Sequence, residues 1–416
     1  MVLNYIWIGF FLVGFLVALY KLLMGGHDDI FSVMMNDFFD AAKNGFEISL
    51  GLTGMMALWL GIMKIGEGAG MIQRFSKTVE PLFSRIFKGV PKGHEAHGSI
   101  AMNFSANMLG LDNAATPLGL KAIADLQTLN PEPKRATDAQ IMFLVLNTAG
   151  MTIIPTSIIA IRQTMAIQQG IVGFNAADIF LPILVCTFFS FIIALVITSL
   201  SQGINLWNRA ILIFVIGFSV FIGGLAFWLQ GLPQELMNQR IGQIGSVSIF
   251  TIILSFLIVG MVKKVNVYEL FIEGAKEGFK VAIGIIPYLI AMLVAISVFR
   301  ASGSMDFVLG GITSLVQVFG WNTDFVPALP VAFMKPLSGS GARGLMVDVM
   351  QEYGVNSFQG KLASIIQGST ETTFYVLAVY FGSVQITNTR NAVLLGLLAD
   401  LIAVVVAIFV AYWFFA

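Results

Sequence analysis

Charged residues are scarce in this chain, and neither sign of charge prevails. Only 11% of its 416 residues are charged, with 23 Lys or Arg against 23 Asp or Glu, whereas 57% are hydrophobic. A soluble globular domain carries about 25% charged residues, so the composition excludes an ordinary soluble globule and indicates a membrane protein. The balanced charge offers no basic surface to nucleic acid, and we expect no nucleic-acid partner.

Cysteine and histidine are also rare. The single cysteine, Cys186, lies within an apolar run, so no disulfide framework exists. The stretch "GHEAHG" holds His94 and His97 around Glu95, but a zinc protease needs two His residues four apart on a helix. We therefore expect a loop there, with neither a metal nor another cofactor. The "SGSG" around Ser340 lacks the glycine spacing of a nucleophile elbow, and without a credible nucleophile and base we expect no enzyme.

Long apolar runs are what this chain has in abundance. Five runs approach or exceed the roughly 20 residues that a helix needs to cross the hydrocarbon, and they cover 5–23, 178–200, 208–230, 246–262 and 391–415. No basic residue precedes the first run, and we expect it to be retained as an anchor. The runs predict an all-α, polytopic protein embedded in membrane lipids.

The chain also repeats itself. "DAAKNGFEISLG" at 40–51 returns as "EGAKEGFKVAIG" at 273–284, and "LNTAGMTIIPTS" at 146–157 corresponds loosely to "IQGSTETTFYVL" at 366–377. We predict two related halves, 1–205 and 206–416, each with one repeat. Weak internal two-fold symmetry in a membrane protein is typical of transporters whose substrate lies where the halves meet.

Each half contains a polar stretch that should interrupt a helix: "NFSANMLGLDNAATP" at 103–117 and "KPLSGSGARG" at 335–344. Backbone groups freed by such breaks are costly in hydrocarbon, so irregular backbone survives only inside protein or along a wet cavity. We therefore predict that both breaks face one cavity. The predicted substrate-binding residues are Asn103, Asn107, Asp112, Asn113, Thr116, Lys335, Ser338, Ser340, Arg343, Gln367, Thr370 and Glu371.

Residue spacing suggests which faces of the flanking helices are wet. Gln367, Thr370 and Glu371 share one helical face by their three- and four-residue spacing, and Thr148 and Thr152 do the same in the first half. We expect one polar face on each helix.

Four of the predicted residues are ionisable, which makes them functional candidates by default within a membrane segment: Asp112, Glu371, Lys335 and Arg343. A structural role stays open for all four, because ion pairs and amide caps would hold the broken segments together. A further structural role is open for Lys335 and Arg343: their side chains would extend along apolar surface and place the charged ends among the lipid headgroups.

The segment 73–93 places its basic residues among Phe, Val, Leu and Ile at helical intervals. This pattern predicts an amphipathic helix lying in the membrane surface. Its excess of cations favours the cytoplasmic side.

Two signatures carry a family resemblance. "ANMLGLDNAATPLGLKA" at 106–122 resembles the signature of spore maturation protein A, and "PLSGSGARG…QGSTETTFYVLAVYFGSV" within 336–384 resembles that of spore maturation protein B. The chain thus resembles a fusion of the two, within the group that carries the nucleoside recognition, or gate, domain. The resemblance implies gate units built from broken helices and re-entrant hairpins. It also implies a multi-pass protein of the bacterial cytoplasmic (inner) membrane, but it implies no particular substrate.

Together these features predict a transporter of a small polar solute, nucleoside-like or an organic anion, that works by alternating access. We expect coupling to protons or sodium through Asp112 or Glu371. The alternative is a non-transporting membrane scaffold or ligand sensor in envelope homeostasis. A homo-oligomer stays open, since small residues are abundant on the apolar helices.

Overall fold

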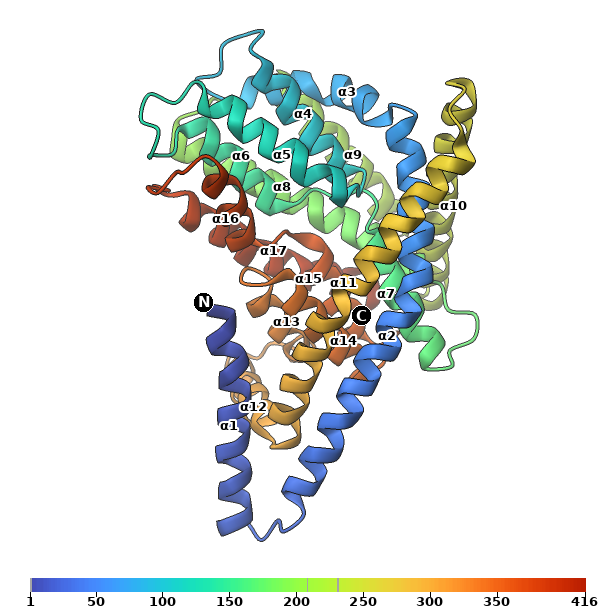
Figure 1. Ribbon diagram of the computed structural model, residues 1–416, viewed down its shortest axis with the longest axis vertical. Helices are drawn as coiled ribbons and strands as arrows, with labels where there is room; N and C mark the ends of the chain where they lie inside the picture. Colours follow the sequence, from blue (N-terminus) through green and yellow to red (C-terminus); the bar gives the residue numbers. More distant parts are fainter. Residues whose placement is uncertain (1, 208, 230–231) are drawn as a thin grey trace.

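The computed structural model describes residues 2–207, 209–229 and 232–416, and of these ranges it does not describe the side chains of residues 2, 112, 113, 210, 226 and 234. The described residues fold into α-helices joined by turns (Figure 1), so the fold is all-helical, as predicted. In chain order the helices are α1 (Val2–Met24), α2 (Ile30–Gly68), α3 (Met71–Ile86), α4 (Glu95–Met108), α5 (Asp112–Gln127), α6 (Asp138–Ala149), α7 (Thr156–Gln168), η1 (Ala176–Ile179), α8 (Phe180–Gln202), α9 (Arg209–Leu229), α10 (Gln234–Val262), α11 (Val267–Ala301), α12 (Ser304–Val318), η2 (Val326–Ala328), α13 (Leu329–Met334), α14 (Gly339–Tyr353), α15 (Phe358–Ser369), α16 (Thr373–Ser383) and α17 (Ala392–Phe415).

Among the described residues, seven helices are long and apolar enough to cross a membrane: α1, α2, α8, α9, α10, α11 and α17. Five of them confirm the predicted apolar runs, although residues 208 and 230 at the ends of one run lie outside the described residues. Sequence analysis missed α2 and α11. Both are longer than a bilayer requires, and charged residues in their first halves conceal the apolar stretch that follows.

The predicted amphipathic helix is α3, which ends at Ile86 and is shorter than expected. Its buried side chains include Ile72, Leu82 and Phe83, whereas Arg74 and Lys77 are exposed. Its position at the membrane surface stays a prediction.

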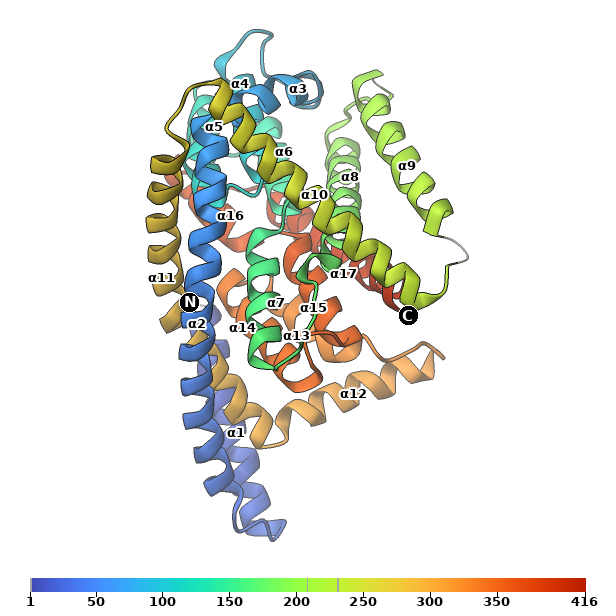
Figure 2. The same ribbon diagram turned by 90° about the vertical axis from the view of Figure 1, so that its right-hand side faces the viewer.

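The helices form two series of the same order, α1 to α8 and α10 to α17, and α9 lies between them in the chain. Each series has two long helices, an amphipathic or short apolar helix, a helical hairpin, a helix interrupted by non-helical residues and a final spanning helix. Helix α9 packs outside the two series (Figure 2), with Phe218 stacked on Phe188 of α8 at 3.6 Å between ring centroids. The predicted boundary at 205/206 falls between α8 and α9.

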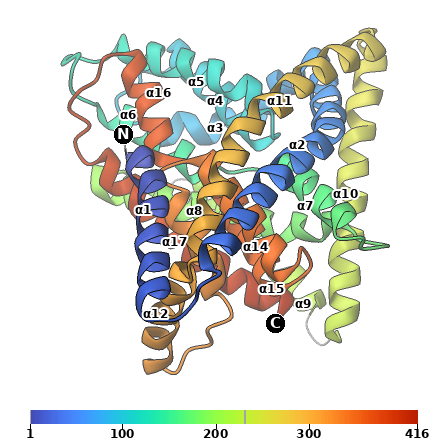
Figure 3. The same ribbon diagram turned by 60° about the horizontal axis from the view of Figure 1, so that its bottom comes forward.

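The two series are inverted relative to each other, as the packing of α2 against α11 demonstrates (Figure 3). A methyl group added to Gly45 would meet Ile290, and one added to Gly278 would meet Ala57. In the repeat, Gly278 is the counterpart of Gly45, and Ile290 is the counterpart of Ala57. The same contact therefore occurs twice, with the helices antiparallel, which is the arrangement of an inverted repeat.

Helix α6 shows how local sequence positions the interior. Thr137 and Gln140 form a capping box at its start, and Gly150 ends it with φ +52 in the left-handed region. Every residue from Ala139 to Ala149 is buried. Such burial on all sides places α6 in the core rather than on the surface.

Candidate functional site

Two interrupted helices cross at the centre of the molecule. Helix α6 ends at Ala149 and α7 begins at Thr156, while α15 ends at Ser369 and α16 begins at Thr373. The two interruptions are bonded directly, because the Glu371 amide N donates to the Thr148 carbonyl O at 2.8 Å. The interruption between α6 and α7 thus supplies the acceptor for a backbone N–H that the interruption between α15 and α16 leaves without a helical partner.

Glycine allows this close crossing. A Cβ at position 150 would lie 3.1 Å from Glu371 N and 3.3 Å from the Thr370 carbonyl C. Its positive φ also disfavours any other residue.

Each interruption is bonded to a helical hairpin of its own half. In the first half, Ile153 N donates to Met108 O at 2.8 Å, at the turn between α4 and α5. In the second half, Phe374 N donates to Pro336 O at 3.1 Å, at the turn between α13 and α14. Carbonyl groups of the hairpin turns thereby accept hydrogen bonds from backbone N–H groups at both interruptions.

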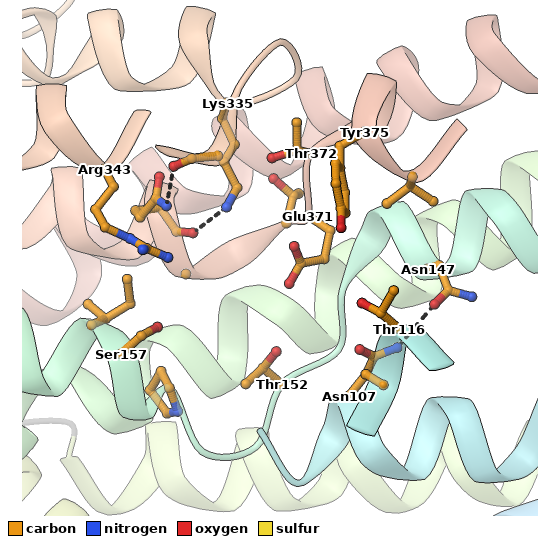
Figure 4. A pocket seen from close by; sticks show the side chains of 18 of the residues that line it. Asn107, Thr116, Asn147, Thr152, Ser157, Lys335, Arg343, Glu371, Thr372 and Tyr375 are labelled. Atoms are coloured by element: carbon orange, nitrogen blue, oxygen red, sulfur yellow. Dashed lines mark hydrogen bonds between the residues drawn. The ribbon is translucent and has the colours of Figure 1, made fainter. Parts of the chain in front are cut away.

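These four elements enclose a cavity of about 230 Å³ (Figure 4). Both halves contribute polar side chains to it, including Asn107, Thr116, Asn147, Thr152, Ser157, Lys335, Arg343, Gln367, Thr370, Glu371, Thr372, Tyr375 and Tyr380. The two broken regions that the sequence predicted to face one cavity thus meet there.

Seven of the predicted substrate-binding residues line this cavity: Asn107, Thr116, Lys335, Arg343, Gln367, Thr370 and Glu371. Asn107 Nδ2 donates to Asn147 Oδ1 at 3.0 Å, and the buried Lys335 Nζ donates to Gln367 O at 2.9 Å. Figure 4 places Lys335 and Arg343 toward one end of the cavity and the Asn107–Asn147 pair toward the other, with Glu371 between them. Their roles in binding stay predictions.

Three other predicted residues hold the hairpins together. The buried Asn103 donates from Nδ2 to Ala115 O at 2.8 Å, which ties α4 to α5. Ser338 caps α14 by accepting from Gly341 N at 3.0 Å, and its Oγ lies 3.2 Å from that of Ser340. The side chains of Asp112 and Asn113 lie outside the described residues.

The predicted polar helical faces are wrong. Gln367 belongs to α15, but Thr370, with φ −142 and ψ 167, and Glu371 lie in the non-helical segment between α15 and α16. Thr148 likewise lies within α6, whereas Thr152 follows the Gly150 cap. The helices end because their terminal groups bond across the interruption instead of along one helix.

Three helix N-termini border the cavity. Ser157 lies in the first turn of α7, Gly339 begins α14, and Thr372 precedes the first residue of α16. The partial positive charge of these termini adds to the charges of Lys335 and Arg343. Glu371 is exposed within this positive surrounding.

Further cavities adjoin the central one. A cavity of about 90 Å³ shares Thr156, Ser157 and Arg343 with it. That cavity in turn shares Lys64 and Glu277 with a third of about 550 Å³ beside α3. Lys64 Nζ lies 3.4–3.6 Å from carboxylate oxygens of Glu67, Glu273 and Glu277. This ion cluster lies where the second and third cavities meet.

Sequence analysis did not select several polar residues of this region, among them Asn147, Ser157, Thr372, Tyr375 and Tyr380 of the cavity lining and the nearby Asp400. Asn147 pairs with Asn107, and Asp400 on α17 accepts a hydrogen bond from Thr373, the first residue of α16. Asp400 is the one acid within the apolar run 391–415, and that signal was sufficient to select it.

The stretch "GHEAHG" leads into α4. His94 Nδ1 accepts from Ala96 N at 3.2 Å and so caps α4, which makes this stretch a helix start as well as a loop. Within the described ranges, no group of three His, Cys, Asp or Glu residues is placed to hold a metal ion.

Comparison with known proteins agrees with the resemblance seen in the sequence. The model of the Gate family, described as nucleoside recognition, matches residues 49–165 and 282–387, which together exceed half of the chain. Spore maturation protein B of Bacillus subtilis (strain 168) is 48% identical over 38% of this chain and 88% of its own length. Spore maturation protein A of the same organism is 36% identical over 47% of this chain and 92% of its own length. The two relatives cover different halves of the chain, and no solved structure matches it.

Proposed function

Because this chain belongs to the Gate (nucleoside recognition) family, we propose that it carries a small polar solute across the bacterial inner membrane by alternating access. The hairpins α4–α5 and α13–α14 act as re-entrant elements, and the crossing interruptions form the binding site. Coupling to protons or sodium supplies the driving force. As before, we expect no enzymatic activity.

One observation carries the proposal: both inverted halves line the same cavity. When a site lies between two such halves, rocking of one half against the other changes the side from which the site is open. The adjoining cavities that end beside α3 support an access route on one side. The buried Arg162 of α7 donates to Val355 O at 3.0 Å and to Ser364 Oγ at 3.3 Å in the other half, and these bonds support a closed arrangement between the halves there.

The lining suggests the chemistry of the solute. A volume of about 230 Å³ is below the roughly 300–1,000 Å³ of sites for drug-sized ligands, so the solute is small. Lys335, Arg343 and the helix N-termini suit an anionic group. Glu371 with the Asn107–Asn147 amides suits hydroxyl or N–H donors. An organic anion uses mainly the first set, whereas a nucleoside uses mainly the second.

Ligand-dependent thermal stability of the purified protein tests the site. We expect one member of a panel of nucleosides and small organic anions to raise the melting temperature, because a ligand of the native state stabilises it by mass action. The rise should vanish in Asn107→Ala and Glu371→Gln. It should persist in Glu80→Gln, which changes an exposed carboxylate on α3.

Flux in proteoliposomes then tests transport. Uptake of the stabilising ligand should require the same two side chains. If the two variants bind normally, the site is wrong. If the ligand binds but does not cross the membrane, the protein is a sensor or scaffold instead.

A further inference from the structure

Asp400 is a buried acid on a membrane-spanning helix that the proposed binding site does not include. It is only 4% exposed, on α17, and Thr373 Oγ1 donates to its Oδ2 at 2.5 Å. Its other oxygen, Oδ1, is buried and accepts no hydrogen bond from any residue that the structure describes. One half of this carboxyl group is therefore bonded and the other is not.

An ionised carboxylate in this position is costly. A buried charge requires a partner and hydrogen bonds to its lone pairs, and an acid within a membrane segment is rare unless it has a function. A proton on Oδ1 would remove the charge and occupy no additional volume. A sodium ion would instead need several oxygen ligands around the same enclosed atom.

The surroundings of Asp400 contain groups that act on its charge. The charged residues Lys335 and Glu371 line the central cavity, and so does Thr372, which directly precedes Thr373, the hydrogen-bond partner of Asp400. Cys186 of α8 also faces α17, with its thiol donating to Ala403 O at 3.8 Å. A change in the cavity therefore alters the electrostatic environment of Asp400, and the reverse holds as well.

The bond to Thr373 connects Asp400 to the cavity mechanically. Thr373 begins α16, and its neighbour Thr372 lines the cavity. A methyl group on Gly396, one turn before Asp400, would lie 2.9 Å from Thr373 Cγ2 and 3.9 Å from Thr148 Cγ2. Both interrupted helices thus pack against α17 beside this acid.

Thr148 supplies a second unsatisfied oxygen. Its buried Oγ1 has no hydrogen-bond partner among the described residues. Buried polar atoms are nearly always satisfied, so the packing of α6 and α16 against this part of α17 leaves two polar atoms that the described residues do not satisfy.

We propose that Asp400 is a proton-binding site whose protonation weakens the contact between α17 and the first turn of α16. The link to solute movement rests on the proposed function, whereas proton binding does not. In the ionised form, Thr373 donates a charge-assisted hydrogen bond to Oδ2. When Oδ1 takes a proton, that bond weakens and the N-terminal turn of α16 is released toward the cavity.

Infrared difference spectroscopy of the purified protein in lipid tests proton binding directly. We expect a protonated-carboxyl C=O band whose intensity titrates with pH. The band should be lost in Asp400→Asn and retained in Glu371→Gln. In Thr373→Val, which removes one hydroxyl and keeps the shape, the midpoint should move to higher pH because the charge-assisted bond is gone.

Three results would overturn the proposal: the absence of such a band, its survival in Asp400→Asn, or its loss in Glu371→Gln alone. Displacement of the band by sodium at constant pH would assign the site to that ion and would also overturn it.

Proteoliposomes separate this proposal from the proposed function. Asp400→Asn should retain ligand-induced thermal stabilisation but lose solute-driven proton movement. A titrating Asp400 in a protein that transports nothing would support the proton site and refute the transporter. Unchanged proton movement in Asp400→Asn would refute coupling through this residue.

Discussion

Replacement of Gly150 by alanine tests the crossing of the two interrupted helices. The new methyl group would lie 3.1 Å from both Cγ and N of Glu371 and 3.3 Å from the carbonyl carbon of Thr370. Two of these atoms belong to the backbone, which cannot rotate out of the way as a flexible side chain can. The non-helical segment at 370–372 must therefore shift, and the bond from Glu371 N to Thr148 O breaks or lengthens.

A second glycine isolates the size of this effect. Gly170 also has a positive φ, +68, but nothing lies within 4 Å of a Cβ added there. An alanine in the left-handed region costs roughly 1–2 kcal/mol, and both variants carry that cost. A buried backbone group that loses its hydrogen bond costs about 1–3 kcal/mol in addition. Gly150→Ala should therefore be less stable than Gly170→Ala by about 1–3 kcal/mol.

Unfolding by titration with a denaturing detergent in mixed micelles, followed by circular dichroism, measures this difference. Ligand-induced stabilisation should also weaken in Gly150→Ala and not in Gly170→Ala, because only the first substitution displaces Glu371. Equal stability of the two variants would mean that the two interruptions are not in contact, and therefore that they do not line one cavity.

Two further substitutions test the packing between the halves. Gly278→Ala should destabilise the protein by more than about 1 kcal/mol because its methyl group meets the backbone of α2. Gly284→Ala on the same helix, with open space around it, should be neutral or stabilising by up to about 1 kcal/mol. Equal effects of the two substitutions in the same unfolding assay would contradict the inverted packing. Arg162→Met should cost about 3–5 kcal/mol, since it removes the hydrogen bonds to Val355 O and Ser364 Oγ of the second half and leaves Asp178 buried without its main partner. Arg390→Met, which removes a half-exposed ion pair with Asp138, should cost about 0–1 kcal/mol, and the opposite order would show that the buried Arg162 contributes less to stability than this half-exposed pair.

Much of this architecture could be predicted from the sequence because it depends on local pattern. The scarcity of charge placed the chain in a membrane, and five apolar runs matched spanning helices. The repeated segment around Gly45 and Gly278 indicated two related halves, and these two glycines occupy equivalent contacts. Seven of the predicted polar residues line one cavity because polar residues amid apolar helices must face a wet or protein-filled space.

What the tertiary structure alone decided is how the released backbone groups are satisfied. Spacing placed Thr370 and Glu371 on a helix, but α15 ends at Ser369 because Glu371 N bonds to Thr148 of the other half. No local pattern specifies a partner so far away in the chain. For the same reason the pairing of Asn107 with Asn147 followed only from the fold. Composition and periodicity thus determined the membrane class and the polar residues, whereas packing between the inverted halves decided where those residues meet, because a freed amide takes whichever acceptor three-dimensional packing brings within reach.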